Sequence, residues 1–201
     1  MKDRKEYILE KAFDVFMSHG YDSASITVLQ KELGMSRGIM YRYFKSKDEL
    51  FIAVIDKYVI GLINRFKLQA VEDMTLIEMI EHRYRYHKRV MIALDKQNLK
   101  LRFLNFTALI IQAAKHYPGF IEQTEMIKAE NLKLWKKAIL NSLEKDEIRG
   151  DVRVDIIAGL FSSGSTNPEI EMADYDREKN FSQHAEIWKR DMEYLYSLIK
   201  K

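Results

Sequence analysis

Residues 25–47 constrain this chain more than any other stretch, because their pattern predicts two short helices joined by a tight turn. Leu29 and Leu33 are four residues apart, so they lie on one face of the first helix, and Ser25 can cap its first turn. Gly34 can adopt the left-handed backbone conformation that ends a helix at little energetic cost. The stretch therefore begins with a short amphipathic helix that stops at a glycine turn.

A second short helix is predicted directly after this turn. Ser36 is a suitable N-cap residue, and the helix should run to about Phe44, where the polar residues 45–47 stop it. Met40 and Phe44 are four residues apart, so both are expected to face the hydrophobic core. Two helices joined by a short turn that contains glycine form the helix-turn-helix motif, whose second helix enters the major groove of DNA.

The outer face of the second helix carries residue types that suit contact with DNA. Gly38 and Arg42 lie opposite the core-facing side, and Gly38 allows the backbone to approach DNA closely. Arginine can donate to guanine edges or to phosphates, and tyrosine, threonine and the amides at a capped helix start can donate to phosphates. This reasoning gives as candidates for DNA contact Thr27, Ser36, Arg37, Gly38, Tyr41, Arg42 and Tyr43.

Each of these features also has a simpler interpretation. Residues 27–47 contain five basic side chains and one acidic side chain, in a protein whose net charge is only +3. Such a local excess of charge is also common on a solvated helix face. A Tyr-x-Tyr-Phe cluster is common in ordinary core packing. Ile39 can touch a thymine methyl group in the groove or simply pack, and the sequence supports both equally.

Helices are also predicted on both sides of this motif. Residues 3–18 carry apolar side chains at helical spacing, and Gly20 ends that helix. After the motif, Ser46 and Glu49 are spaced as a capping box, in which each side chain accepts from the other residue's backbone amide. The box begins a long helix whose apolar stripe consists of Leu50, Phe51, Val54, Ile55, Tyr58, Val59, Leu62, Ile63 and Phe66.

The middle of this region is more specific than a bare helix-turn-helix. It reads Gly34-Met35-Ser36-Arg37-Gly38-Ile39-Met40-Tyr41-Arg42-Tyr43-Phe44-Lys45-Ser46-Lys47. With this run, the first quarter of the chain resembles the TetR family of bacterial transcriptional regulators. The resemblance implies a homodimeric repressor with an all-helical ligand-binding core. Carried over residue by residue, it implies DNA contacts from Thr27, Arg37, Gly38, Tyr41, Tyr43 and Lys47.

The composition is consistent with an all-α fold. Only two prolines and eight glycines interrupt the 201 residues, which leaves room for long helices. We expect a three-helix helix-turn-helix DNA-binding domain at residues 1–47, followed by a helical ligand-binding and dimerisation domain at residues 48–201. The chain contains no cysteine, which excludes disulfides and thiolate zinc sites. No signal peptide or membrane span is recognised, so we expect a cytoplasmic protein without membrane contacts.

Beyond residue 70, helical spacing predicts further helices at residues 75–94, 95–116, 120–145, 152–163 and 182–200. Between the last two lies a polar stretch, residues 162–180, that contains the second proline. A connection this long inside a compact domain is usually functional or mobile.

A dimer interface is expected on the last two of these helices, because two-fold dimers are the commonest oligomers. The alternative is that their apolar residues only close the core of one protomer, and the resemblance favours the dimer. The candidates are Ile156, Leu160, Ile187, Trp188, Met192, Leu195 and Ile199.

A pocket for a small-molecule effector is expected among the helices after residue 48. Aromatic residues are candidate walls, although aromatic residues at helical spacing often form ordinary core. The candidates are Phe66, Tyr84, Phe103, Phe106 and Trp135.

Nothing in the sequence predicts an enzyme, a metal site or a cofactor. The five histidines are scattered, and no phosphate-binding loop or nucleophile elbow is present. A second basic cluster at residues 83–89 is interpreted as a solvated face that could instead receive an acidic ligand. The sequence thus favours a regulator that binds double-stranded operator DNA and a small molecule. The alternative is a helical small-molecule binding or interaction protein that does not bind DNA.

Overall fold

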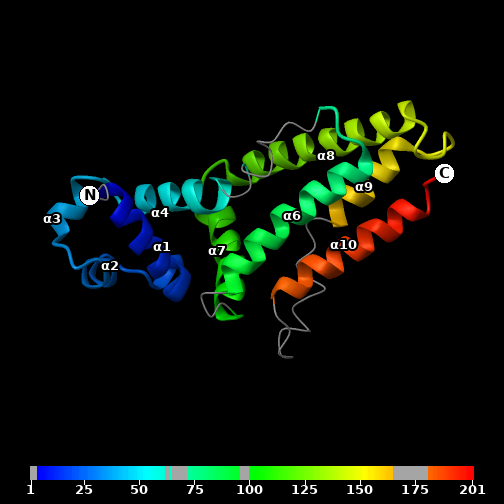
Figure 1. Cartoon of the computed structure of the whole chain (residues 1–201). Coiled ribbons are helices and arrows are strands. Elements are labelled where there is room, and N and C mark those ends of the chain that lie inside the picture. Colours follow the sequence, from blue (N-terminus) through cyan, green and yellow to red (C-terminus); the bar gives the residue numbers. More distant parts are fainter. Residues whose placement is uncertain (1–3, 62–63, 65–71, 96–99, 165–180) are drawn as a thin grey trace. The chain divides into compact units, whose positions relative to one another are not determined.

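The computed structural model describes residues 4–61, 64, 72–95, 100–164 and 181–201, without the side chains of 90–95, 100–104 and 181–184. These residues form nine α-helices and one π-helical turn, and they contain no β-strand beyond the isolated bridge between Ile148 and Lys200 (Figure 1). The predicted all-α fold is therefore confirmed. The chain divides into two compact units. Unit 1 consists of Met1–Arg65 and Lys100–Glu125, and unit 2 of Phe66–Leu99 and Met126–Lys201.

Unit 1 is built around α1 (Arg4–Ser23), which packs against α2 (Ile26–Leu33), α4 (Lys47–Ile55) and α7 (Lys100–His116). The short helix α3 (Arg37–Tyr41) packs against α2. Apolar side chains from α1, α2 and α4 are almost completely excluded from solvent and fix these helices against one another. They include Ile8, Ala12, Phe16, Leu29, Leu33, Leu50 and Phe51.

The predicted signals at the first helix of the motif are confirmed. The Ser25 hydroxyl accepts a hydrogen bond from the Val28 amide at 3.3 Å, and Gly34 ends α2 in the left-handed conformation. At the second helix the prediction is partly wrong. Ser36 takes the N-cap position, but its side chain makes no capping hydrogen bond. The helix α3 ends at Tyr41, three residues before the predicted end, and turns carry the chain on to Phe44.

The predicted capping box at the start of α4 is half correct. The Ser46 hydroxyl accepts from the Glu49 amide at 3.1 Å, as expected. The Glu49 carboxylate, however, accepts from the amide of Lys45 at 2.6 Å, one residue earlier than predicted. The start of α4 is therefore still capped from both sides, because the carboxylate satisfies a neighbouring amide.

The long helix predicted from Asp48 changes its winding after α4. Residues Asp56–Ile60 form a π-helical turn, η1, in which the Gly61 amide bonds to the carbonyl of Asp56, five residues back. The burial pattern follows this winding, because Val54 and Val59 are buried five residues apart, as are Ile55 and Ile60. The predicted stripe, drawn for α-helical spacing, included Tyr58 and omitted Ile60.

Unit 2 contains α6 (Leu76–Asp95), most of α8 (Phe120–Glu144), α9 (Val154–Gly164) and α10 (Phe181–Ser197). The helices α6 and α10 pack side by side (Figure 1). Trp135 of α8 is fully buried, and its ring stacks on Phe161 of α9 at a centroid distance of 5.4 Å. The chain end is fixed to the α8–α9 connection, since the Arg149 amide donates to the Ile199 carbonyl at 2.8 Å.

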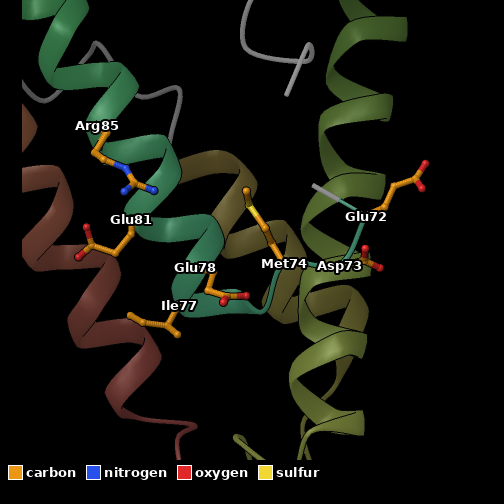
Figure 2. Close-up of a pocket in the computed structure, with 7 residues that line it drawn as sticks. All are labelled: Glu72, Asp73, Met74, Ile77, Glu78, Glu81 and Arg85. Atoms are coloured by element: carbon orange, nitrogen blue, oxygen red, sulfur yellow. The ribbon is translucent and has the colours of Figure 1, made fainter. Parts of the chain in front are cut away.

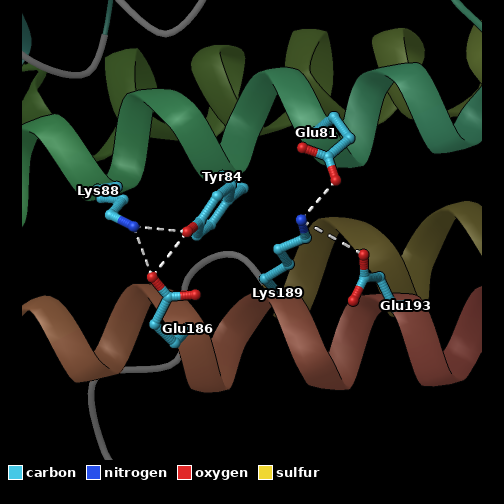
Figure 3. A network of polar contacts seen from close by, with 6 residues as sticks. All are labelled: Glu81, Tyr84, Lys88, Glu186, Lys189 and Glu193. Carbon is cyan, nitrogen blue, oxygen red and sulfur yellow. Dashed lines mark hydrogen bonds and ion pairs between the residues drawn. The ribbon is translucent and has the colours of Figure 1, made fainter.

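Two groups of polar contacts join α6 to α10 (Figure 3). Glu186 accepts from both the Tyr84 hydroxyl and the Lys88 ammonium at 2.7 Å. Lys189 pairs with Glu81 at 2.6 Å and lies 4.7 Å from the centre of the Tyr84 ring. Because these groups are partly exposed, each pair is expected to contribute little to stability.

The second basic cluster, residues 83–89, is not uniformly a solvated face. Arg83 is buried, with 8% of its surface exposed, and donates to the Asn131 side chain at 2.7 Å. Burial lowers the pKa of Arg83 to about 10. Asn131 in turn donates to the Ser162 hydroxyl at 3.2 Å, so polar side chains link α6, α8 and α9 inside unit 2.

The predicted boundary after residue 47 divides a DNA-binding domain from a ligand-binding and dimerisation domain, and this functional division stays a prediction. The compact units follow packing instead, because α4 and α7 both contact α1 in unit 1. The polar stretch at residues 162–180 lies outside the described residues after Gly164.

Candidate nucleic-acid interface

The helix α3 has one inner and one outer face, as its sequence predicts. Met40 is 2% exposed and Phe44, just beyond the helix, is 3% exposed, so both anchor this segment in the core. Gly38 and Arg42 are exposed on the opposite side. Among the described residues, no atom beyond the neighbouring residues and the backbone of α3 lies within 4 Å of the position that a Gly38 Cβ would occupy. This face therefore presents the Arg42 cation and, at Gly38, a short stretch of backbone without a side chain.

Arg37 is exposed at the start of α3, and its guanidinium lies 5.3 Å from the centre of the Tyr41 ring. This cation–π contact restricts the arginine while leaving its N–H groups able to donate. Tyr43 and Ile39 are half-buried. Part of the Ile39 side chain therefore packs in the protein, and part is accessible to a partner.

Thr27 is exposed in the first turn of α2, and Ser36 is exposed directly before α3. The Ser36 hydroxyl caps no amide of α3, so it is available to donate to a phosphate oxygen. With Lys47 at the start of α4, the predicted DNA contacts all lie between Thr27 and Lys47 in unit 1.

Lys47 contacts Tyr21, which was not among the predicted site residues. Its ammonium donates to the Tyr21 carbonyl at 3.0 Å and lies 4.0 Å from the centre of the Tyr21 ring. The Tyr21 hydroxyl donates to the carboxylate of Asp48. Burial, together with this hydrogen bond, raises the pKa of Tyr21 to about 12. Tyr21 directly follows Gly20, which was predicted to end the first helix; in the structure Gly20 instead interrupts α1 with a φ of 71°, and α1 continues to Ser23.

The predicted pocket walls are distributed over both units, and some of them lie outside the described residues. Phe66 lies outside the described residues, as does the side chain of Phe103. Phe106 is half-buried on α7 in unit 1. Tyr84 belongs to the network between α6 and α10, and Trp135 lies in the core of unit 2.

An open hollow of about 540 Å³ lies beside the start of α6 in unit 2 (Figure 2). It contains none of the predicted wall residues. Two of its carboxylates are already engaged, because Glu78 accepts from the Thr75 amide at 2.8 Å and Glu81 pairs with Lys189. Its lining consists of Glu72, Asp73, Met74, Ile77, Glu78, Glu81 and Arg85.

The predicted dimer residues separate into two groups. Ile156 and Leu160 are exposed on one face of α9, at 49% and 47%. Trp188, Met192 and Ile199 are instead buried in the core of unit 2, while Ile187 and Leu195 are half-buried. Of the predicted dimer residues, Ile156 and Leu160 are therefore the two that a single protomer leaves largely exposed to a second copy.

Comparisons with known proteins match the region that carries this interface. Residues 8–54 match the family model described as bacterial regulatory proteins, tetR family. The chain is 41% identical over 51 residues to the HTH-type transcriptional repressor Rv1474c of Mycobacterium tuberculosis. The aligned region covers 25% of this chain and 27% of the repressor. The chain is also 30% identical over 92 residues to the HTH-type transcriptional activator FasR of Mycolicibacterium smegmatis. This aligned region covers 40% of this chain and 42% of the activator. These matches span less than half of either relative.

Similarity to solved structures extends over the whole chain. A putative transcriptional regulator from Saccharomonospora viridis in complex with choline has a TM-score of 0.69 at 15% identity, with both chains fully covered. The regulator FadR from Bacillus subtilis in complex with stearoyl-CoA has a TM-score of 0.59 at 15% identity, covering 92% of this chain and 96% of that one. At such identities the likeness establishes the shared fold.

Proposed function

This chain belongs to the TetR family of bacterial transcriptional regulators, and we propose that it binds a palindromic operator as a homodimer and releases it when a small molecule binds. The observation that supports DNA reading most directly is the two-sided segment at α3. Met40 and Phe44 anchor it, while Arg37, Gly38 and Arg42 are exposed. A helix anchored in this way can lie in a major groove with its cations toward bases and phosphates. Repression rather than activation is the proposed outcome, as for the M. tuberculosis relative.

Support for a homodimer comes from the exposed apolar side chains of unit 2. Ile156 and Leu160 are four residues apart on α9, and Tyr194 and Leu198 are four residues apart near the end of α10. Apolar residues repeated at this spacing form stripes that a second copy can cover. Two copies of α3 would then read half-sites about one helical turn apart, or a multiple of it.

Support for a small-molecule effector comes from a buried polar group of unit 2 and from the ligand-bound structures that share the fold. The Trp135 Nε1–H group is buried without a hydrogen-bond acceptor among the described residues. A buried donor of this kind is costly unless an acceptor reaches it. We propose that the effector binds near Trp135. It must bind the DNA-incompetent state more tightly than the competent state, because otherwise it could not shift the equilibrium.

The proposal is tested by selecting bound DNA from a random pool with the full chain, followed by a screen for small molecules that release it. Recovery of a palindrome, bound less tightly as salt increases, is the expected result. If the protein enriches no sequence and shows no salt-dependent binding to DNA, the alternative of a helical binding or interaction protein is correct.

The change Arg37→Ala is expected to weaken operator binding by about 1–3 kcal/mol and to relax base preference at one position of each half-site, if the guanidinium reads a base edge. Arg149→Ala is the matched control, because it removes an exposed arginine of unit 2 far along the chain from α3. Fluorescence anisotropy with the selected operator and its single-base variants measures both effects. Equal affinities for Arg37→Ala and the control would remove Arg37 from the interface.

The change Gly38→Ala is expected to separate stability from DNA binding. In the part of the chain that the structure describes, a Cβ at this helical position makes no close contact outside its own helix. Alanine favours a helix by about 1 kcal/mol over glycine. Thermal unfolding should therefore occur at the same temperature or higher. Operator affinity should fall, because the added methyl group occupies space where the backbone approaches DNA. An unchanged operator affinity would mean that α3 does not lie close to DNA at residue 38.

A further inference from the structure

Contacts from α4 and α7 converge on Tyr21, near the end of α1. Tyr21 itself is 8% exposed, so it cannot reach DNA. Its carbonyl and ring hold the Lys47 ammonium, and its hydroxyl bonds to Asp48. Its ring also packs on Phe51, at a centroid distance of 4.6 Å. Tyr21 therefore contacts both residues that begin α4 and the core beneath them.

The other side of Tyr21 is fixed by α7. Gln112 accepts from the Tyr21 amide at 2.6 Å, and the His116 ring stacks on the Tyr21 ring at 4.2 Å. The approach of Gln112 depends on Gly20, because a Cβ at Gly20 would lie 2.7 Å from the Gln112 Nε2 atom. Residues of α7 thus hold the backbone and the ring of Tyr21. Tyr21 in turn contacts Lys47 and Asp48 at the start of α4.

The charge of Lys47 remains usable in this arrangement. A lysine ammonium has three donors, and the Tyr21 carbonyl takes one of them. The side chain is only half-buried, so the remaining donors can meet a phosphate oxygen. The cation–π contact and the hydrogen bond restrict a flexible side chain before DNA arrives, which reduces the entropy lost on binding.

We propose that Tyr21 is a positioning residue for DNA binding, which holds the Lys47 ammonium at the phosphate backbone and is itself held in place by Gln112 and His116 of α7. This inference rests on the proposed DNA-binding function. It also assigns α7 a role in setting phosphate affinity, since a displacement of Gln112 or His116 moves the residue that orients Lys47.

The test is a double-mutant comparison of operator binding over a range of salt concentrations. Lys47→Ala should weaken binding to all sequences and reduce the slope of log K against log salt by about one per protomer. Tyr21→Leu keeps apolar volume but removes the ring, and it should reduce the slope by a similar amount. The double variant should lose no more slope than either single variant, because both changes disable the same contact.

Three further variants separate positioning from general stability. Tyr117→Leu is the matched control, since Tyr117 is another unit 1 tyrosine whose hydroxyl bonds to a carboxylate, Asp56 at 2.7 Å. It should lower the melting temperature but leave the salt slope unchanged. Tyr21→Phe keeps the ring and the carbonyl, so it should retain the wild-type slope. Gln112→Leu should reduce the slope if α7 sets the place of Tyr21.

The outcomes are distinguishable from a failure of the proposed function. If the wild-type protein binds no DNA, the proposed function is wrong. If the wild type binds its operator while Tyr21→Leu, folded at the assay temperature, keeps the full slope, the positioning role is wrong and the function stands. If the double variant loses the sum of the slopes lost in Tyr21→Leu and Lys47→Ala, the positioning role is also contradicted, because the effects of independent residues are additive.

Discussion

Replacing Trp135 by alanine is expected to lower the free energy of unfolding of unit 2 by about 3–5 kcal/mol, the usual cost of removing a buried aromatic side chain. Trp135 is fully buried and stacks on Phe161, so its removal leaves a cavity between α8 and α9. Chemical denaturation followed by tryptophan fluorescence measures the loss. Trp188, the other tryptophan of the chain, also lies in unit 2 and keeps the signal specific to it.

Leu140→Ala is the matched control on the same helix. Leu140 is 49% exposed, so its truncation should change the free energy of unfolding by no more than about 0.5 kcal/mol in a single protomer. If Trp135→Ala costs no more than Leu140→Ala, the core of unit 2 is not centred on Trp135. A loss of effector response in a milder variant, Trp135→Phe, would connect the same position to the proposed effector site.

Replacing Gly20 by alanine is expected to destabilise unit 1 by about 2–4 kcal/mol. Gly20 has φ 71° and ψ 166°, a region that only glycine occupies readily, and forcing another residue into it costs about 1–3 kcal/mol. The new Cβ would also displace Gln112, and the lost hydrogen bond to the Tyr21 amide adds about 1 kcal/mol. Both tryptophans lie in unit 2, so their fluorescence does not report directly on unit 1. Far-UV circular dichroism during denaturation is therefore used to follow the loss of the unit 1 helices.

Gly34→Ala distinguishes these two causes. Gly34 also has a positive φ, 63°, but a Cβ there would meet no atom of the described residues within 4 Å beyond its chain neighbours. Its replacement should therefore cost only the left-handed conformation, about 1–2 kcal/mol. Equal losses at the two glycines would show that the Gln112 contact contributes nothing to stability.

The parts of the fold that the sequence predicted are those decided by neighbouring residues. The cap at Ser25, the turn at Gly34 and the inward side of α3 each depend on groups within four positions of one another. The link between Tyr21 and Lys47 joins residues 26 positions apart, so no local pattern could reveal it. The burial of Phe44 was predicted, whereas the turns that replace the helix after Tyr41 were not.

Burial of charge was also beyond the sequence. Arg83 lies in a run of cations that suggested a solvated face, yet its guanidinium is buried beside Asn131. Whether one arginine of such a run turns inward depends on which helices pack over it. The predicted pocket residues stay a prediction, and aromatic residues at helical spacing do not reveal which unit they join. Phe106 belongs to unit 1, whereas Tyr84 and Trp135 belong to unit 2.

The π-helical turn η1 affects how this chain should be aligned with its relatives. A turn closed over five residues holds one residue more than an α-helical turn, so the helix that begins at Lys47 carries a surplus residue before Gly61. A relative whose helix is α-helical throughout can bury the same side chains with one residue fewer. We expect such relatives to show a single-residue gap at Asp56–Ile60, and a shift of every residue number beyond it. Correspondences drawn across that point without the gap would pair core positions of one protein with surface positions of the other.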